Sequence, residues 1–331
     1  MTSGSSSGQV YLQTYLAPLA ELLGRSDVTD LYINAPGEVW VEALGGGIEH
    51  HHIKTLTSEV LARLARQIAA HTHQGINREH PILSATLPGG ERVQIVIPPA
   101  TRGEIVFAIR KHVSSDLLLD DYATSGAFDA ARQENTSAAT LDERLRALHD
   151  AGDYAALLSI AVKGRRNVLV SGGTSTGKTT FLNALIHEIP TEERLILIED
   201  TPELHLRHPN AVGLLAARSA LGEASVTAED LLTASLRMRP DRIILGELRG
   251  PEAYTFLRAV NTGHPGSMTT VHADSPERAI EQIALLVLQG GTRLRREDVL
   301  HYVRATIDVF VQLSRIGGRR QITTVKLRGN S

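Results

Sequence analysis

The chain has 331 residues, of which 42% are apolar and 21% charged, and its formal net charge at pH 7 is −3. It contains no cysteine, which excludes disulfides, cysteine-ligated zinc and thiol catalysis, and the mildly acidic balance gives no general reason to expect a nucleic-acid partner. A chain of this length usually forms two domains. Apolar runs stay well short of the roughly 18 residues of a membrane span, and the start of the chain lacks a signal-peptide profile, so we expect a cytoplasmic protein with no integral membrane segment.

The amino-terminal part of the chain is expected to form a small α+β domain. Residues 1–9 are rich in Ser and Gly and are predicted to be disordered. Over residues 10–112 the apolar spacing predicts helices at 11–23 and 55–73 and strands at 28–33, 38–42, 92–97 and 104–109. The three histidines at 50–52 are expected in a solvated loop, where metal binding would be adventitious.

The rest of the chain begins with a linker and then alternates between strand-like and helix-like segments. Residues 113–153 are acidic and polar and are predicted to be a linker with some helix. Over residues 154–331 we expect strands at 167–170, 194–199, 242–245, 266–271 and 308–313, and a hairpin turn at 315–320 leading to a last strand at 321–327. Because helical segments separate most of these strands, we predict an α/β domain with a mainly parallel sheet covered on both faces.

The most specific motif lies between the first of these strands and a helix-like run at 181–186. It fits the phosphate-binding pattern G-x-x-x-x-G-K-[ST] and comprises Gly172, Gly173, Thr174, Ser175, Thr176, Gly177, Lys178, Thr179 and Thr180. Its glycines let backbone N–H groups approach a phosphate, and the following helix adds the positive end of its dipole. Lys178 is expected to reach the β- and γ-phosphates and Thr179 to offer its hydroxyl to Mg²⁺. The motif therefore predicts a nucleoside triphosphate site.

Carboxylates follow two of the predicted strands. Glu199 and Asp200 end the strand that begins at Arg194, and carboxylates at this edge of a parallel sheet face the ligand crevice, where they could hold Mg²⁺. Capping of the next segment is the alternative. Glu247 ends the next strand, where a motor ATPase needs a group to orient or deprotonate the attacking water; a plain surface carboxylate is the alternative. Gly246 stands where an aspartate would bind Mg²⁺ through water.

Two histidines flank a further strand-like run within residues 261–276. His264 and His272 are eight residues apart, which is not the spacing of a helical metal site. We expect them to contact the γ-phosphate or to transmit its loss, although a structural role in a Gly-rich turn is the alternative.

Together these motifs resemble the secretion traffic ATPases. The phosphate loop, the acidic strand end, the Gly-Glu strand end and the histidine segment follow the order and spacing of that family, and residues 28–42 resemble its first domain. The chain is most similar to the VirB/TrbB-type motors of type IV secretion and conjugation, which are related to type II secretion and type IV pilus motors. The tetracysteine subdomain of many type II secretion and pilus-extension members is missing, which favours the conjugation branch.

The resemblance implies a fold, a cofactor and a set of roles. It implies a homo-hexameric ring in which ATP and Mg²⁺ lie between the amino-terminal domain and a RecA-like carboxy-terminal P-loop domain, with arginines of the first domain reaching the phosphates. Matching positions are Arg92 and Arg110, with Arg102 as a weaker third choice. The remaining matches are the acidic box at Glu199 and Asp200, the catalytic glutamate at Glu247 and the histidine box at His264 and His272.

The function implied is that of an ATP-hydrolysing motor that energises substrate export or pilus and channel assembly. Its expected partners are further copies of itself, inner-membrane subunits of a secretion machine, and an exported protein or protein–DNA cargo. The expected location is cytoplasmic, peripherally associated with the inner membrane. Two other functions remain open at this stage: a RecA-like nucleic-acid motor, and a scaffold whose docking conformation is set by nucleotide binding alone.

Overall fold

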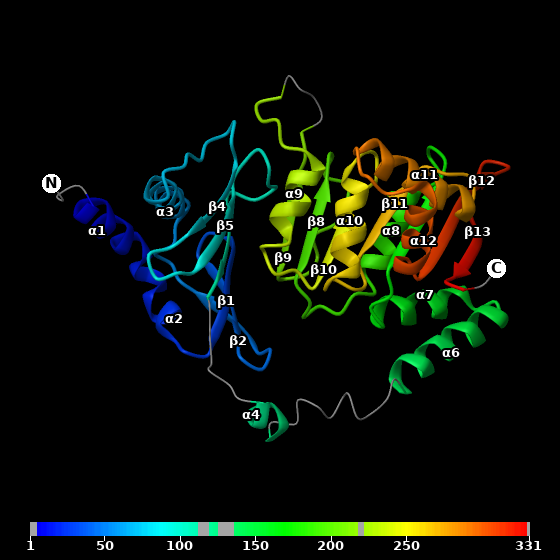
Figure 1. The fold of residues 1–331 in the computed structure, drawn as a ribbon, viewed down its shortest axis with the longest axis horizontal. Helices are drawn as coiled ribbons and strands as arrows, with labels where there is room; N and C mark the ends of the chain where they lie inside the picture. The colour runs from blue at the N-terminus through cyan, green and yellow to red at the C-terminus, as the bar shows by residue number, and fades with distance from the viewer. Residues whose placement is uncertain (1–4, 112–118, 125–135, 218–221, 330–331) are drawn as a thin grey trace.

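The computed structural model describes residues 5–111, 119–124, 136–217 and 222–329, which form two α/β units (Figure 1). The N-terminal unit contains α1 (Ser5–Leu16), a 3-10 turn (Ala17–Leu19), α2 (Ala20–Gly24), β1 (Val28–Ala35), β2 (Glu38–Ala43), β3 (Ile48–His52), α3 (Ser58–His71), β4 (Ile82–Thr86), β5 (Arg92–Val96) and β6 (Val106–Arg110). Its six strands form one antiparallel sheet in the order β3-β2-β1-β6-β5-β4.

The two faces of this sheet have different neighbours because side chains alternate along each strand. Leu31, Ile33, Val39 and Val41 point to one face and share a hydrophobic core with side chains of α1 and α3. The opposite face, which includes Tyr32 and Trp40, packs against the core of the C-terminal unit. Figure 1 shows the three helices on the side of the sheet that faces away from that unit.

The C-terminal unit is larger and lies beyond α4 (Leu119–Thr124). It contains α6 (Thr136–Asp150), α7 (Tyr154–Lys163), β7 (Val168–Gly172), α8 (Lys178–Ile186), β8 (Leu195–Glu199), β9 (Ala211–Leu215), α9 (Ala228–Ser235), β10 (Arg242–Leu245), α10 (Glu252–Asn261), β11 (Met268–Val271), α11 (Pro276–Gln289), α12 (Arg296–Thr306), β12 (Val309–Ile316) and β13 (Arg319–Leu327). The seven strands pair in the order β13-β12-β7-β11-β10-β8-β9, and every pairing is parallel except that of β12 with β13.

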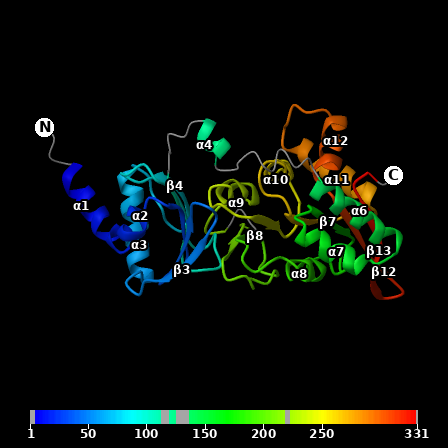
Figure 2. The ribbon, with the colours of Figure 1, turned by 90° about the horizontal axis from the view of Figure 1, so that it is seen from below.

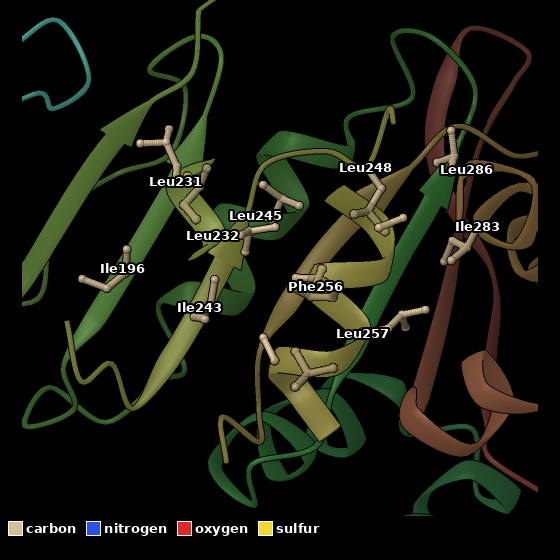
Figure 3. Close-up of a cluster of buried hydrophobic side chains, with 14 of the residues drawn as sticks. Ile196, Leu231, Leu232, Ile243, Leu245, Leu248, Phe256, Leu257, Ile283 and Leu286 are labelled. Atoms are coloured by element: carbon tan, nitrogen blue, oxygen red, sulfur yellow. The ribbon is translucent and has the colours of Figure 1, made fainter. Parts of the chain in front are cut away.

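Both faces of this sheet are buried, as expected for a parallel sheet. Figure 3 shows Ile243 and Leu245 of β10 with Phe256 and Leu257 of α10 in the core on one face. Ile244, between them in sequence, belongs to the core on the other face, which includes side chains of α7 and α8. Figure 2 shows α9 and α10 on one side of the sheet and α7 and α8 on the other. The predicted α/β class with a mainly parallel sheet is confirmed.

The two units are joined by main-chain and side-chain contacts. The loop between β5 and β6 extends the C-terminal sheet beyond β9, since Thr101 forms an antiparallel bridge with Leu214. At the amino end of β8, the guanidinium of Arg194, which is fully buried, lies 4.0 Å from the ring centroid of Tyr32 and donates to Asn34 at 3.0 Å. These contacts fix how the N-terminal sheet sits on the C-terminal unit.

Three predictions about the amino-terminal part and the linker differ from the structure. Helix α1 begins at Ser5, inside the segment 1–9 that was expected to be disordered, and its Leu12 is buried in the core with α3. The histidines at 50–52 form β3 rather than a loop, because β2 offers them a strand to pair with. Within the expected linker, residues 136–150 form α6, whose His149 Nε2 lies 3.0 Å from the carbonyl oxygen of Val325. This helix belongs to the C-terminal unit, while residues 112–118 and 125–135 lie outside the described residues.

Besides β3, two further described strands were missed by the sequence analysis. Strand β4 follows a loop rich in polar residues, and β9 contains Gly213, which interrupts its apolar run. Over the part of the chain that the structure describes, no helix combines the length and apolar character needed to cross a bilayer.

Candidate functional site

The phosphate loop connects β7 to α8 in the way that its sequence predicts. Strand β7 ends at Gly172 and α8 begins at Lys178. Gly177 precedes the helix with φ +93°, a conformation in which L side chains are strained. A Cβ added to Gly172 would lie 2.8 Å from the carbonyl oxygen of Leu313, so the neighbouring strand β12 leaves room only for glycine there. The loop geometry thus depends on these two glycines.

Lys178 lies at the centre of the loop. Its ammonium group donates to the carbonyl oxygens of Gly172 and Gly173 at 3.0 and 3.2 Å and lies 3.3 Å from Nδ1 of His272. The residue is buried, and this burial lowers the pKa of its ammonium group. The two carbonyl oxygens hold the ammonium group at the loop, where the β- and γ-phosphates of a nucleotide bind in P-loop proteins.

A chain of polar contacts leads from Lys178 to the predicted acidic residues. Nε2 of His272 lies 2.9 Å from one carboxylate oxygen of Glu247, and the other oxygen of Glu247 accepts from Arg249 at 2.8 Å. Arg249 also forms an ion pair with Asp200. The carboxyl ends of β8, β10 and β11 meet at this edge, which explains why residues so distant in sequence converge.

Glu199 has a different set of contacts from its neighbour Asp200. One of its oxygens accepts from the backbone N–H groups of Glu203 and Leu204 at 2.9 and 2.7 Å, and the other pairs with Arg102. The side chain is buried, with 6% of the residue exposed. These contacts favour the capping alternative for Glu199. They also account for Gly246, because a Cβ at that position would lie 3.3 Å from Cγ of Glu199.

The two histidines lie at opposite ends of β11. His272 follows the carboxyl end of the strand and contacts Lys178 and Glu247. His264 precedes the strand, is half-buried near Arg239, and its backbone carbonyl accepts from the hydroxyl of Ser267 at 2.8 Å. Burial and the charge of Arg239 lower the pKa of His264. Of the two histidines, only His272 lies beside the phosphate loop within one chain, because β11 separates them. The expected role of His264, contact with the γ-phosphate or transmission of its loss, stays a prediction.

The predicted arginines lie on the N-terminal sheet, away from the phosphate loop of the same chain. Arg92 and Arg110 are partners across β5 and β6 and line a cavity of about 510 Å³ together with Arg237 of the C-terminal unit. Nε of Arg110 donates to Asp30 at 2.9 Å. Arg102, the third choice from sequence, instead reaches the acidic box through Glu199. Within a single chain Arg102 thus contacts the acidic box, whereas Arg92 and Arg110 line the cavity, and contact of these arginines with the phosphates stays a prediction.

Two arginines at the site were missed by the sequence analysis. Arg249, which joins Glu247 to Asp200, lies two residues after the predicted base in the same motif, and this short spacing was its only signal. Arg320, near the tip of the β12–β13 hairpin, lies against Gly177, since a Cβ added there would come within 3.1 Å of Arg320 Cδ. The sequence of residues 315–320 predicted a hairpin turn but not a contact with the phosphate loop.

Comparison with known proteins agrees with this geometry. A family model described as "Type II/IV secretion system protein" matches residues 13–312. The chain belongs to this family. Its relatives include the VirB11 proteins of the type IV secretion systems of Bartonella henselae, 40% identical over 94% of this chain and 91% of the relative, and Brucella suis, 42% identical over 90% and 84%. PtlH of the Bordetella pertussis type IV secretion system is 36% identical over 99% of this chain and 98% of its own length.

A solved structure supports the same conclusion for the secretion ATPase described here. The crystal structure of the Brucella suis VirB11 ATPase in complex with sulphate matches with a TM-score of 0.91 at 40% identity, covering 97% of this chain and 96% of that one. The resemblance inferred from the four motifs is confirmed, as is the fold class of a RecA-like P-loop domain preceded by a smaller α+β domain.

Proposed function

We propose that this secretion ATPase couples hydrolysis of Mg²⁺-bound ATP to the work of a type IV secretion machine. The observation that carries this proposal is the contact chain Lys178–His272–Glu247 at the mouth of the phosphate loop. It joins the lysine that neutralises phosphate charge to the carboxylate that acts on water. The names of the relatives, which belong to type IV secretion systems, support the choice of machine.

The residues at the loop divide the work of hydrolysis. Backbone N–H groups of the loop and the ammonium of Lys178 bind and orient the phosphates, and Glu247 accepts a proton from the attacking water or orients it. His272, in contact with both residues, holds their relative positions. Charge on the transferring phosphoryl group is thereby met by groups that are already in place, which is the main source of catalysis in this class of reaction.

Oxygen ligands for Mg²⁺ are present beside the loop. Thr179 follows Lys178 in the first turn of α8, and Asp200 is joined to the contact chain through Arg249. Hydroxyl and carboxylate oxygens are the ligands that Mg²⁺ prefers, so this donor set fits the ion. When bound, Mg²⁺ would neutralise negative charge on the phosphates. Glu199 is assigned a supporting role, because its carboxylate is occupied by backbone N–H groups and Arg102.

Arg92 and Arg110 are proposed to act on the nucleotide of a neighbouring subunit. Within one chain they line a cavity with Arg237, on the N-terminal sheet. A ring, as implied by the family resemblance, would place this face against the phosphate loop of the next copy. The two arginines would then neutralise charge on the phosphoryl group as it transfers, an effect worth roughly 10³ to 10⁵ in rate in well-studied enzymes.

The assembly and location follow from the same proposal. A homo-hexameric ring on the cytoplasmic side of the inner membrane would bind membrane subunits of the machine and act on an exported protein or protein–DNA cargo. Movement of the N-terminal unit relative to the C-terminal unit would transmit hydrolysis to these partners.

Two substitutions test the catalytic core. Lys178→Ala removes positive charge from the phosphates and is expected to abolish both tight ATP binding and phosphate release. Glu247→Gln is expected to retain ATP binding and to lose turnover, because an amide cannot accept the proton. Glu203→Gln, at an exposed carboxylate of the neighbouring loop, serves as the control and is expected to hydrolyse ATP like the wild type. Equal turnover by Glu247→Gln and wild type would show that another group activates the water.

A further inference from the structure

The hairpin formed by β2 and β3 brings three potential metal ligands onto one face. Glu38 is paired with His52 and Trp40 with His50 across the two antiparallel strands. Because side chains alternate along a strand, Glu38, His50 and His52 point to the same side of the sheet, whereas His51 points to the other. This is the side on which Trp40 packs against the core of the C-terminal unit.

The ligand atoms of these three residues are close together. One nitrogen of each histidine and one carboxylate oxygen of Glu38 all lie within 4.8 Å of one another. Nε2 of His50 is 3.7 Å from the nearer oxygen of Glu38, and the ring centroids of His50 and His52 are 4.8 Å apart. The ring of His50 stacks on Trp40 at 4.1 Å between centroids with an angle of 12° between the planes. Trp40 therefore limits the orientations that His50 adopts.

We propose that Glu38, His50 and His52 form a binding site for Zn²⁺. Two imidazoles and one carboxylate are a common set of protein ligands for this ion, and three ligands leave a fourth position for water or another donor. Bonds of about 2.0 to 2.2 Å to a tetrahedral ion require ligand atoms about 3.3 to 3.6 Å apart. Rotation of the exposed His52 side chain and of the carboxylate closes the remaining gap, with no change in the pairing of the strands.

A metal ion bound by Glu38, His50 and His52 would link two neighbouring strands. Strand β3 is the edge of its sheet and pairs with β2, so a metal bound by residues of both strands cross-links the edge to the strand next to it. On the same face, Glu42 of β2 pairs with Arg239 of the C-terminal unit at 2.8 Å. Metal binding would thus stabilise the hairpin at the rim of the contact between the units, with its open coordination position accessible from solvent.

A Zn²⁺ titration of the full-length protein tests this site directly. Binding is measured by competition with a chromophoric chelator, and Co²⁺ is used as a second probe because its absorption spectrum reports tetrahedral coordination. The wild type is expected to bind one equivalent tightly at neutral pH, where histidine is deprotonated. His52→Ala and Glu38→Gln are each expected to weaken this binding at least about tenfold, since ligand contacts matter at least as much as those that orient ligands.

His51→Ala is the matched control, because His51 lies in the same strand and contacts Glu49 on the opposite face. It is expected to bind Zn²⁺ and Co²⁺ like the wild type and to show the same rise of Tm on adding Zn²⁺, whereas His52→Ala shows no rise. The proposal is overturned if His51→Ala and His52→Ala lower the affinity equally, or if Glu38→Gln binds as tightly as the wild type. Glu38→Gln preserves side-chain volume, so its result does not depend on tolerance of a truncated side chain.

Discussion

The expected catalytic residues lie in two regions. One is the carboxyl edge of the C-terminal sheet, and the other is the face of the N-terminal sheet that packs against the C-terminal unit. At the first, Lys178, His272 and Glu247 are joined by contacts of 2.9 to 3.3 Å within one chain. At the second, Arg92 and Arg110 share a cavity with Arg237 and not with the phosphate loop. The order of strands within one domain thus brings motifs together, whereas the place of an arginine on another domain depends on how whole domains and subunits dock.

Mixing of variant subunits tests whether Arg92 acts on the phosphate loop of a neighbouring subunit, and it has the largest expected effect. Arg92→Ala is expected to lower kcat by roughly 10³-fold, because the charge on the transferring phosphoryl group loses a guanidinium. If the arginine acts on a neighbouring subunit, a mixture of Arg92→Ala and Lys178→Ala chains regains activity, since some interfaces combine an intact arginine face with an intact phosphate loop. Phosphate release by the mixture, compared with each variant alone, measures this.

A double variant that carries both substitutions supplies the control for the mixing experiment. Mixed with Lys178→Ala, it contains no intact phosphate loop and is expected to stay inactive. If the mixture of single variants also stays inactive while ring assembly is retained, Arg92 acts within its own chain, and the N-terminal unit must then move toward its own phosphate loop.

The same comparison explains how far the sequence predicts the site. The phosphate loop, Glu247 and His272 were predicted because each follows a strand of one parallel sheet, and such strands end at a common edge. His264 lies at the opposite end of β11 from His272, as the strand-like run between them implies, and its role at the nucleotide stays a prediction. The contact of Arg102 with Glu199 was not predicted, because no local pattern reveals that its loop extends the sheet at β9.

The proximity of Glu38 to His52 and the packing of α6 could not be predicted from the sequence either. Glu38 and His52 are far enough apart in sequence that only the register of the β2–β3 hairpin makes them neighbours. The polar sequence of α6 indicated a linker, yet Leu145 gives that helix a buried contact with the C-terminal core. In both cases the missing information is tertiary, and the local propensities carry little of it.

The ion pair between Arg102 and Glu199 joins the N-terminal unit to the C-terminal unit, and its contribution to stability can be measured. Arg102→Ala leaves the carboxylate of Glu199 buried without its ion pair and is expected to reduce the free energy of unfolding by about 3 kcal/mol. Urea denaturation measures this change. Arg63→Ala removes an exposed helical pair with Glu59 and is expected to change stability by less than about 0.5 kcal/mol. A loss for Arg102→Ala no greater than that of Arg63→Ala would mean that solvent replaces the ion pair.

His272 and His264 lie at the two ends of β11, so substitutions at these positions are expected to affect kcat differently. His272→Asn is expected to lower kcat by between about tenfold and a hundredfold, the effect of losing the hydrogen bond to Lys178 and the close contact with Glu247. His264→Gln is expected to leave kcat near the wild-type value in single-turnover and steady-state measurements. An equal fall of kcat in both variants would indicate that His264 reaches the nucleotide of a neighbouring subunit.

His264 has instead a predicted effect on stability at acidic pH. Burial and Arg239 lower its pKa in the folded protein, so the unfolded chain binds the proton more tightly. The stability linked to this residue is fully present above the unfolded pKa of about 6.5 and is lost as the pH falls from there through the folded pKa. Urea midpoints at pH 7.5 and 5.5 should therefore differ less for His264→Gln than for the wild type or for His301→Gln, a change at an exposed histidine. Equal shifts of the urea midpoint in His264→Gln and His301→Gln would contradict this prediction. They would mean that protonation of the half-buried His264 does not lower the free energy of unfolding.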